Sequence, residues 1–218
     1  MADDMPKPSA ATPLATATGA RRTQADRRAE SGRGLVQAVV SIVPEQGVGA
    51  ATFEAIGARA GYSRSLVTQR FGSKRGLIDA VIEHAHTAFG AVRLERRMDE
   101  LTGLEALLLM MDVYLTALAT SGELRTYFML LSSAVAEVSD LRAAFAAQHE
   151  LVKQRLAGLV ARGQADGSIR PGLDADAAAL MIGSLELGLS VQLLVDPKMD
   201  LDPIRRTALE TVRASFGA

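Results

Sequence analysis

The chain has 218 residues, of which 48% are hydrophobic, so it is long and apolar enough for one or two domains with a buried core. It has no Cys, which excludes a disulfide framework, a thiolate metal site and a Cys nucleophile. No segment has the pattern of a membrane span, and the opening MADDMPK has acids where a signal peptide has cations, so we expect a cytoplasmic protein.

Residues 1–25 are rich in small residues, Thr and Pro and have no helical or strand period. This composition predicts a disordered arm. Four cations lie at or just beyond its end: Arg21, Arg22, Arg27 and Arg28. An arm that contacts DNA and a merely soluble tail both fit these residues.

Residues 26–83 begin with a helical pattern. Apolar side chains recur at helical spacing between Leu35 and Val43. Pro44 and Gly47 mark the end of this first helix and the turn after it.

Two short helices and a longer one are expected next. The second covers residues 52–60, and Gly61 is suited to end it in a left-handed conformation. Ser63 is placed to cap a third helix over residues 64–70, and Ser73 to cap the longer fourth helix. Two short helices joined by a tight turn that contains Gly form a helix-turn-helix.

Residues 84–218 have the pattern of helices throughout, with about six segments of roughly 15 to 25 residues. Only Ser168 and Ile169 have an extended pattern. The fold class expected from the whole chain is therefore all-α. Breaks between helices are expected at 101–103, 121–122, 139–140, 163–174 and 196–203.

Charge divides near the same boundary. Residues 20–83 carry ten cations and six acids, and residues 84–218 carry thirteen cations and seventeen acids. A basic N-terminal module, residues 20–83, followed by an acidic body, residues 84–218, fits a protein that binds nucleic acid. Random scatter of charge also fits so small a difference.

Residues 51–85, ATFEAIGARAGYSRSLVTQRFGSKRGLIDAVIEHA, carry a resemblance to a known family. The stretch resembles the helix-turn-helix of the tetracycline-repressor (TetR) family of bacterial transcription regulators. Residues 167–197 also look like the ligand and dimer domain of many members. The resemblance implies an N-terminal three-helix DNA-binding domain, residues 26–83, and a C-terminal helical ligand-binding and dimerisation domain, residues 84–218. The matching positions are Thr52, Ile56, Ala60, Gly61, Ser63, Phe71, Ser73, Lys74 and Leu77.

Three positions depart from the family pattern. Ala51 replaces the first of two Thr residues, which removes a hydroxyl from the start of the second helix. Thr68 stands where many members have Tyr, and Arg70 where His is common. The last two changes lie on the expected reading surface, so they bear on which operator is recognised.

The resemblance implies that the third helix enters a major groove. Arg64 is suited to a guanine and Gln69 to an adenine, while Lys74 is suited to a phosphate. The alternative to DNA contact, for each residue, is a position on a solvent-exposed helix face. The predicted DNA-binding residues are Thr52, Tyr62, Ser63, Arg64, Ser65, Thr68, Gln69, Arg70 and Lys74.

The resemblance also implies an effector pocket among the apolar helices of the body. Core packing is the alternative for most of these side chains, although Met-rich surfaces adapt to varied ligands. The effector is expected to be apolar or amphipathic, and neutral or cationic. The predicted lining residues are Met110, Met111, Tyr114, Leu118, Tyr127, Leu130, Met181 and Leu185.

The last two helices are the expected dimer interface. Small residues in residues 174–195 let another helix approach closely, and the final helix has an apolar side. Packing within one subunit is the alternative for part of each face. The predicted interface residues are Gly183, Leu187, Gly188, Val191, Leu194, Leu209, Val212 and Phe216.

These patterns predict a dimeric, DNA-binding transcription regulator, released from double-stranded operator DNA by a small molecule. No metal, cofactor or catalytic constellation is expected, because His84 and His86 diverge on a helix and no catalytic motif is present. Two alternatives remain: a small-molecule binding protein that has lost operator recognition, and an all-helical enzyme.

Overall fold

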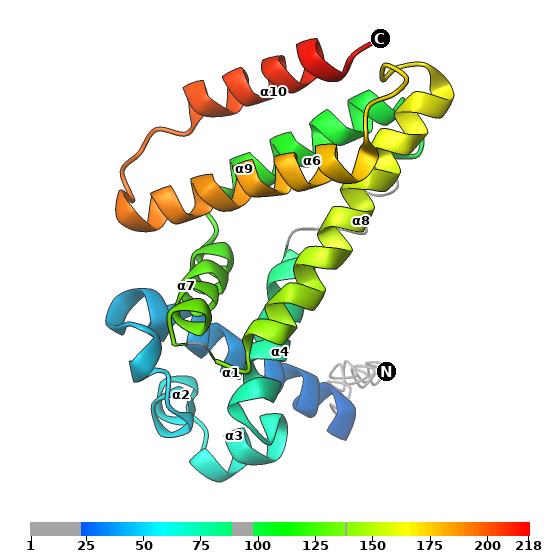
Figure 1. Cartoon of the computed structure of the whole chain (residues 1–218). Coiled ribbons are helices and arrows are strands. Elements are labelled where there is room, and N and C mark those ends of the chain that lie inside the picture. The colour runs from blue at the N-terminus through cyan, green and yellow to red at the C-terminus, as the bar shows by residue number, and fades with distance from the viewer. Residues whose placement is uncertain (1–22, 89–97, 138) are drawn as a thin grey trace, which may run out of the picture.

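The computed structural model describes residues 23–88, 98–137 and 139–218. In these ranges the regular elements are helices, apart from one isolated β-bridge (Figure 1). The N-terminal elements are α1 (Gln24–Gln46), the 3-10 turn η1 (Val48–Ala50), α2 (Phe53–Ala60), α3 (Arg64–Phe71) and α4 (Lys74–Ala88). The remainder contains α6 (Gly103–Leu118), α7 (Gly122–Ala136), α8 (Arg142–Asp166), α9 (Ala175–Val195) and α10 (Asp202–Phe216).

Helix α1 begins two residues before the predicted boundary at residue 26. The Asp26 amide donates to Thr23 Oγ1 over 3.1 Å, and the Thr23 amide donates to Asp26 Oδ2 over 3.0 Å. This reciprocal capping box satisfies amides of the first turn and brings Gln24 and Ala25 into the helix. The rest of the predicted arm, residues 1–22, lies outside the described residues.

The predicted turn between the two short helices is confirmed. Gly61 adopts a left-handed conformation with φ of 76° and ends α2. The Tyr62 amide then donates to the carbonyl of Gly57 over 2.7 Å. A Cβ at Gly57 would lie 2.7 Å from the Tyr62 carbonyl oxygen, so Gly57 lets the chain fold back closely onto α2.

The expected caps of the short helices are present. Thr52 Oγ1 accepts a hydrogen bond from the Ala55 amide, and Ser63 Oγ accepts one from the Leu66 amide. Ser73 Oγ likewise accepts from the Gly76 amide at the start of α4. Because Thr52 caps α2, the replacement of Thr by Ala51 does not cost this helix its cap.

The breaks predicted in the C-terminal part fall between α6, α7, α8, α9 and α10. Asp174 caps α9 by accepting from the Ala177 amide. The short extended pattern at Ser168 and Ile169 corresponds to an antiparallel bridge between Ile169 and Gly217. This bridge ties the loop before α9 to the end of α10.

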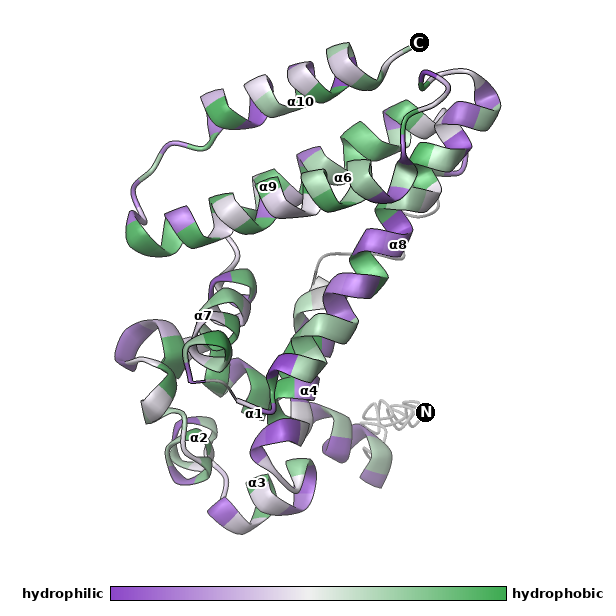
Figure 2. Ribbon diagram, in the orientation of Figure 1, coloured by the Kyte–Doolittle hydropathy of each residue, from purple (hydrophilic) through white to green (hydrophobic). Residues whose placement is uncertain are grey.

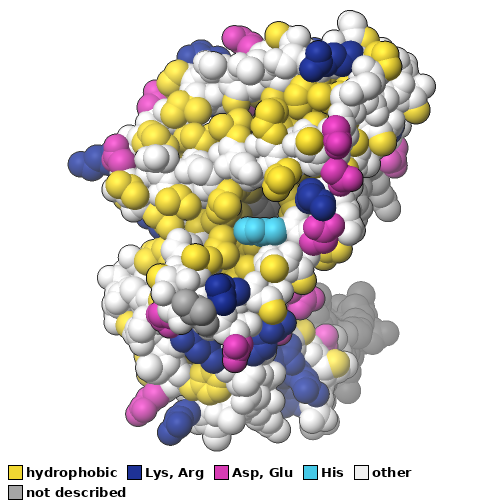
Figure 3. Space-filling model, viewed as in Figure 1, with side chains coloured by type: hydrophobic (Ala, Val, Ile, Leu, Met, Phe, Trp, Pro, Cys, Tyr) yellow, Lys and Arg dark blue, Asp and Glu magenta, His cyan; other side chains and the backbone are white. Residues whose placement is uncertain are grey.

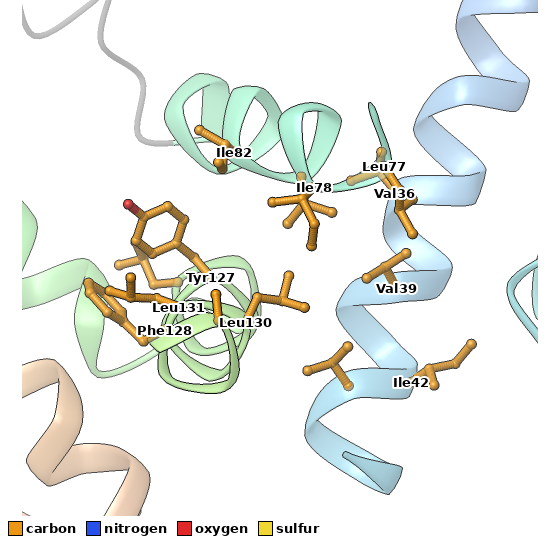
Figure 4. Packing of buried hydrophobic residues seen from close by; sticks show 14 of the residues in the cluster. Val36, Val39, Ile42, Leu77, Ile78, Ile82, Tyr127, Phe128, Leu130 and Leu131 are labelled. Carbon is orange, nitrogen blue, oxygen red and sulfur yellow. The ribbon is translucent and has the colours of Figure 1, made fainter. Parts of the chain in front are cut away.

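Two apolar cores organise the described residues. In the first, α1, α2, α3 and α4 pack with α7, and Figure 4 shows Val39 and Ile78 facing the side of α7 that carries Leu130. In the second, α6 packs with α8, α9 and α10. Helix α7 follows the predicted domain boundary in sequence, yet its apolar face completes the core of the N-terminal helices. Helix α4 crosses that boundary without interruption.

Helix α9 is long and apolar enough, by length and composition alone, to cross a membrane. It packs against α8, α7 and α6, however, and buries Glu186 and Ser190 on that side. Its other side exposes a continuous apolar stripe, with Leu180 61% and Met181 53% exposed. Figure 3 shows apolar side chains spread over this face of α9 and toward α10.

Candidate DNA interface and internal cavity

Helix α3 presents the predicted reading surface to solvent. Val67 is fully buried in the first core, and Phe71 packs against that core. These anchors fix the rotation of the helix, because residues on the opposite side must then face outward. The outward residues are Arg64, Ser65, Thr68, Gln69 and Arg70.

The cations around α3 fall into two groups. Arg59 forms an ion pair with Glu45 over 2.9 Å, and Arg75 forms one with Asp79 over 3.0 Å. Arg64, Arg70 and Lys74 are also exposed, but they form no ion pair with any residue that the structure describes. These three cations therefore carry the uncompensated positive charge of the helix-turn-helix, which suits contact with phosphates or guanines.

The hydroxyls of this region already have local partners. Ser63 Oγ lies 2.8 Å from Ser65 Oγ, and Thr68 Oγ1 donates to the Arg64 carbonyl over 3.1 Å. Thr52 and Tyr62 are exposed at the edge of the same surface. The hydroxyls thus stabilise the two short helices and still have free lone pairs, while the uncompensated charge lies on the cations.

Arg70 lies back against α1. A Cβ placed on Gly32 would be 2.6 Å from Arg70 Nη2, so the guanidinium occupies space that Gly32 leaves open. Arg27 and Arg28 are exposed in the first turn of α1, whereas Arg21 and Arg22 lie outside the described residues. The side chain of Arg70 therefore points toward the start of α1 more than along α3.

A cavity of about 350 Å³ lies in the body, with walls from α4, α6, α7, α8 and α9. Of the predicted pocket residues, Met110, Tyr114 and Tyr127 line it. Met111, Leu118 and Leu130 are buried in the two cores instead. Met181 and Leu185 lie on the exposed stripe of α9, because the side of α9 that faces the cavity carries other residues.

Several lining residues were not predicted from the sequence. Ala85 reaches the cavity from α4, Phe128 from α7 and Arg155 from α8. His149 also lines the cavity, while its neighbour Glu150 pairs with Lys153 over 3.0 Å. Burial lowers the pKa of the His149 imidazole below its usual value.

Glu186 is the acidic residue of this wall. Its side chain is only 6% exposed, and its Oε1 has no hydrogen-bond partner among the described residues. Burial raises the pKa of the Glu186 carboxyl to about 8. Nearby, Tyr114 Oη lies 2.7 Å from Ser190 Oγ, and burial raises the pKa of the Tyr114 phenol.

The predicted dimer residues separate into four groups. Gly188 and Val191 lie on the exposed stripe of α9. Leu194 and Leu209 are half-buried against the cores, and Gly183 and Leu187 line the cavity. Val212 and Phe216 are buried within the subunit, because the apolar side of α10 packs on α6 and so offers no exposed area to a second copy.

Comparisons with known proteins agree with this architecture. The chain is similar to SmeT, the repressor of the Stenotrophomonas maltophilia multidrug efflux pump SmeDEF, with 27% identity and a TM-score of 0.69 over 86% of this chain and 90% of SmeT. The SmeT–triclosan complex matches at 26% identity and a TM-score of 0.68, over 87% of this chain and 92% of that one. The fatty acid degradation regulator FadR from Bacillus halodurans shares the fold at 20% identity, with a TM-score of 0.73 over 84% and 94% of the two chains. No curated protein sequence matches the chain.

Family models match both parts of the sequence. Residues 37–81 match the model for bacterial regulatory proteins of the TetR family. Residues 103–217 match the model for the C-terminal part of BetI-type transcriptional repressors, and this match alone spans more than half of the chain. The chain therefore belongs to the TetR family of DNA-binding transcription regulators.

Proposed function

We propose that the protein is a dimeric repressor that leaves its operator when a small molecule fills the cavity. The observation that carries this proposal is the position of α4. Its first residue, Lys74, lies beside α3, and Ala85 near its other end forms part of the cavity wall. One continuous helix, about 17 Å long between these residues, thus connects the reading surface to the cavity.

The contacts of α4 suit a helix that transmits a displacement from the cavity to α3. It packs against α1, α3 and α7, and its His84 Nε2 lies 4.0 Å from Glu123 Oε1 on α7. A ligand that pushes α4 outward must shift α3, because packed cores deform little. A ligand with ~100-fold preference for the DNA-incompetent state supplies about 2.7 kcal/mol toward release.

The proposed dimer interface is the exposed stripe of α9. A two-fold axis buries the same patch on each subunit, so one self-complementary apolar face is sufficient. Gly188 has open space around it, which lets a partner helix approach closely. The proposed face differs from the predicted set and comprises Met181, Leu185, Gly188, Val191, Val195 and, at its edge beside the cavity, Leu180.

The proposed division of labour follows the predicted boundaries. The part up to residue 83 binds double-stranded DNA through Arg64, Gln69 and Lys74, and the part from residue 84 binds the effector and the second subunit. The similarity to SmeT, which has been seen in complex with triclosan, supports a small, largely apolar effector. Because the family consists of transcription regulators, the proposal is that the protein acts by binding and not by catalysis. It would act in the cytoplasm, where its operator is accessible.

The test uses the DNA upstream of the protein's own gene. We expect salt-dependent binding of the wild-type protein, measured by fluorescence anisotropy at several salt concentrations. Compounds that raise the melting temperature are then tested for release of the bound DNA. If stabilising compounds leave the operator complex intact, the ligand-released mechanism is wrong. If no DNA from the flanking region binds better than random DNA, the repressor assignment is wrong.

A further inference from the structure

Glu186 is an unusual residue for its position. It lies in the middle of α9, on the side that faces the cavity, and it is more than nine-tenths buried. Oε1 of its carboxyl has no hydrogen-bond partner among the described residues. A buried polar atom without a partner lowers the stability of the fold. Its presence in a ligand-sized cavity therefore suggests that a bound ligand supplies the missing partner.

Ser190, Tyr114 and Lys153, three polar residues near Glu186, have partners other than its carboxyl. Ser190 Oγ donates to the Glu186 carbonyl over 2.7 Å, which leaves Tyr114 Oη as the donor in its 2.7 Å contact with Ser190. Lys153 pairs with Glu150 and Asp176 at 3.0 and 4.0 Å. Arg155, which also lines the cavity, has an interaction of its own, but its Nη2 is buried without a hydrogen-bond partner among the described residues, as Glu186 Oε1 is. Burial, and not a charged neighbour, shifts the pKa of the Glu186 carboxyl, so the described residues show no ion-pair partner for it.

The other walls suit an organic cation. The rings of Tyr114, Tyr127 and Phe128 line the cavity together with Met110 and Leu156. Aromatic faces attract alkylammonium groups, and the attraction is stronger in a desolvated site. A carboxylate and several rings around one apolar space thus offer both charge and apolar area to the same ligand.

We infer that the cavity binds an amphipathic organic cation, whose positive group lies against Glu186 and the aromatic rings, and that binding expels one proton from Glu186. The neutral carboxylic acid and the cation become a carboxylate–cation pair, and the proton leaves to solvent. This inference rests on the proposed function, because it takes the cavity to be the effector site.

The protonation state of Glu186 makes the inference measurable. With a pKa of about 8, the carboxyl of the empty cavity is mostly neutral at pH 7. A bound cation favours the carboxylate, so its apparent affinity should rise by up to about tenfold per pH unit as the pH approaches 8, and then level off.

Other titratable groups around the cavity do not mimic this profile. The pKa values of Tyr114 on α6 and Tyr127 on α7 are raised above their usual range, and that of His149 on α8 is lowered. The hydrogen bond to Glu150 raises the pKa of Lys153, also on α8, above its usual value. A rise in affinity between pH 6 and pH 8 would thus report on Glu186.

The experiment compares three probes of equal chain length: octyltrimethylammonium, octanoate and 1-octanol. Isothermal titration calorimetry in buffers of different ionisation enthalpy measures affinity and proton release for the full chain. We expect the cation to bind best and to release close to one proton at pH 7 and almost none at pH 9.5. Glu186→Gln should weaken cation binding at least tenfold at pH 9 and leave octanol binding unchanged. Glu210→Gln, which removes an exposed carboxylate on α10 away from the cavity walls, is the matched control and should bind like wild type.

Octanoate binding more tightly than the cation, or cation binding without proton release at pH 7, would overturn the inference even if Glu186→Gln failed to fold. Equal cation affinity in Glu186→Gln and wild type would also overturn it. If octanol releases operator DNA and the cation does not bind, the inference fails and the repressor assignment stands. If the cation binds with proton release to a protein that binds no operator, the cavity inference stands and the proposed function fails.

Discussion

Two exposed helix faces of this molecule, those of α3 and α9, differ in chemistry. Helix α3 exposes Arg64, Thr68 and Gln69, whereas α9 exposes Leu180, Met181 and Leu185. In Figure 2, α3 has several hydrophilic positions, whereas most positions of α9 are hydrophobic or intermediate. A polar face with uncompensated cations can be exposed to water before it binds DNA. Exposure of an extended apolar face to water is unfavourable, so such a face is normally covered by a partner. This contrast supports the proposal that α3 binds its partner reversibly and that α9 forms a permanent interface.

The α9 face gives the largest expected effect. Gly188→Arg places a long cation in the centre of the apolar stripe, so it should convert dimers to monomers and weaken operator binding at least 100-fold. Gly158→Arg on α8 is the matched control, because Gly158 is also exposed and has nothing near its Cβ position. Analytical ultracentrifugation at micromolar concentration measures the assembly. A monomeric wild-type protein would contradict the proposed permanence of this interface.

The α3 face should respond to single cations. Arg64→Ala is expected to cost about 1–3 kcal/mol of operator binding and to relax one base position. Lys74→Ala should weaken binding to all sequences and flatten its salt dependence. Arg170→Ala, an exposed cation beside the bridge at Ile169, is the control for charge alone. If both α3 variants bind like wild type at every salt concentration, the assigned reading surface is wrong.

The buried side of α9 contrasts with its exposed side through one residue, Glu186. Because burial raises the pKa of this carboxyl from 4.5 to about 8, the folded state binds more protons than the unfolded state between these values. Stability therefore falls as the pH rises through this window. Glu186→Gln should remove this fall, with a gain in melting temperature on the order of 5–10 °C at pH 9 and a smaller gain at pH 5. Differential scanning calorimetry at both pH values measures it, and equal gains would contradict the proposed titration.

The smallest expected effect concerns the packing behind α3. Gly32→Ala must displace the guanidinium of Arg70, which is the flexible end of a side chain, so the fold should persist. We expect a change of only a few-fold in operator affinity. Gly34→Ala is the control on the same helix, because its Cβ would lie at an ordinary 3.7 Å from Tyr62. Both changes should stabilise α1 by up to about 1 kcal/mol through helix propensity. An unchanged affinity in Gly32→Ala would show that the position of Arg70 does not matter for DNA binding.

Much of the fold was predictable from local signals. Thr52, Gly61 and Ser63 cap or end their helices as expected, since capping depends on residues three or four positions apart. Val67 and Phe71 are four positions apart, so they lie on one side of α3, and that side packs against the core. The early start of α1 at Thr23 was missed although its capping box, Thr23 with Asp26, is visible in the sequence.

Tertiary packing alone decided which apolar residues of the body line a cavity and which fill a core. Met110 and Met111 are neighbours in sequence, yet Met110 lines the cavity and Met111 is fully buried in the second core. Val212 and Phe216 form an apolar stripe that would suit a dimer, but α10 uses it to cover α6. The sequence by itself determined where capped helices such as α2 and α3 begin and end, because capping depends on neighbours along the chain. Whether the apolar side of a helix meets a core, a cavity or a second subunit depends on which distant helix packs against it, and only the tertiary structure decides that.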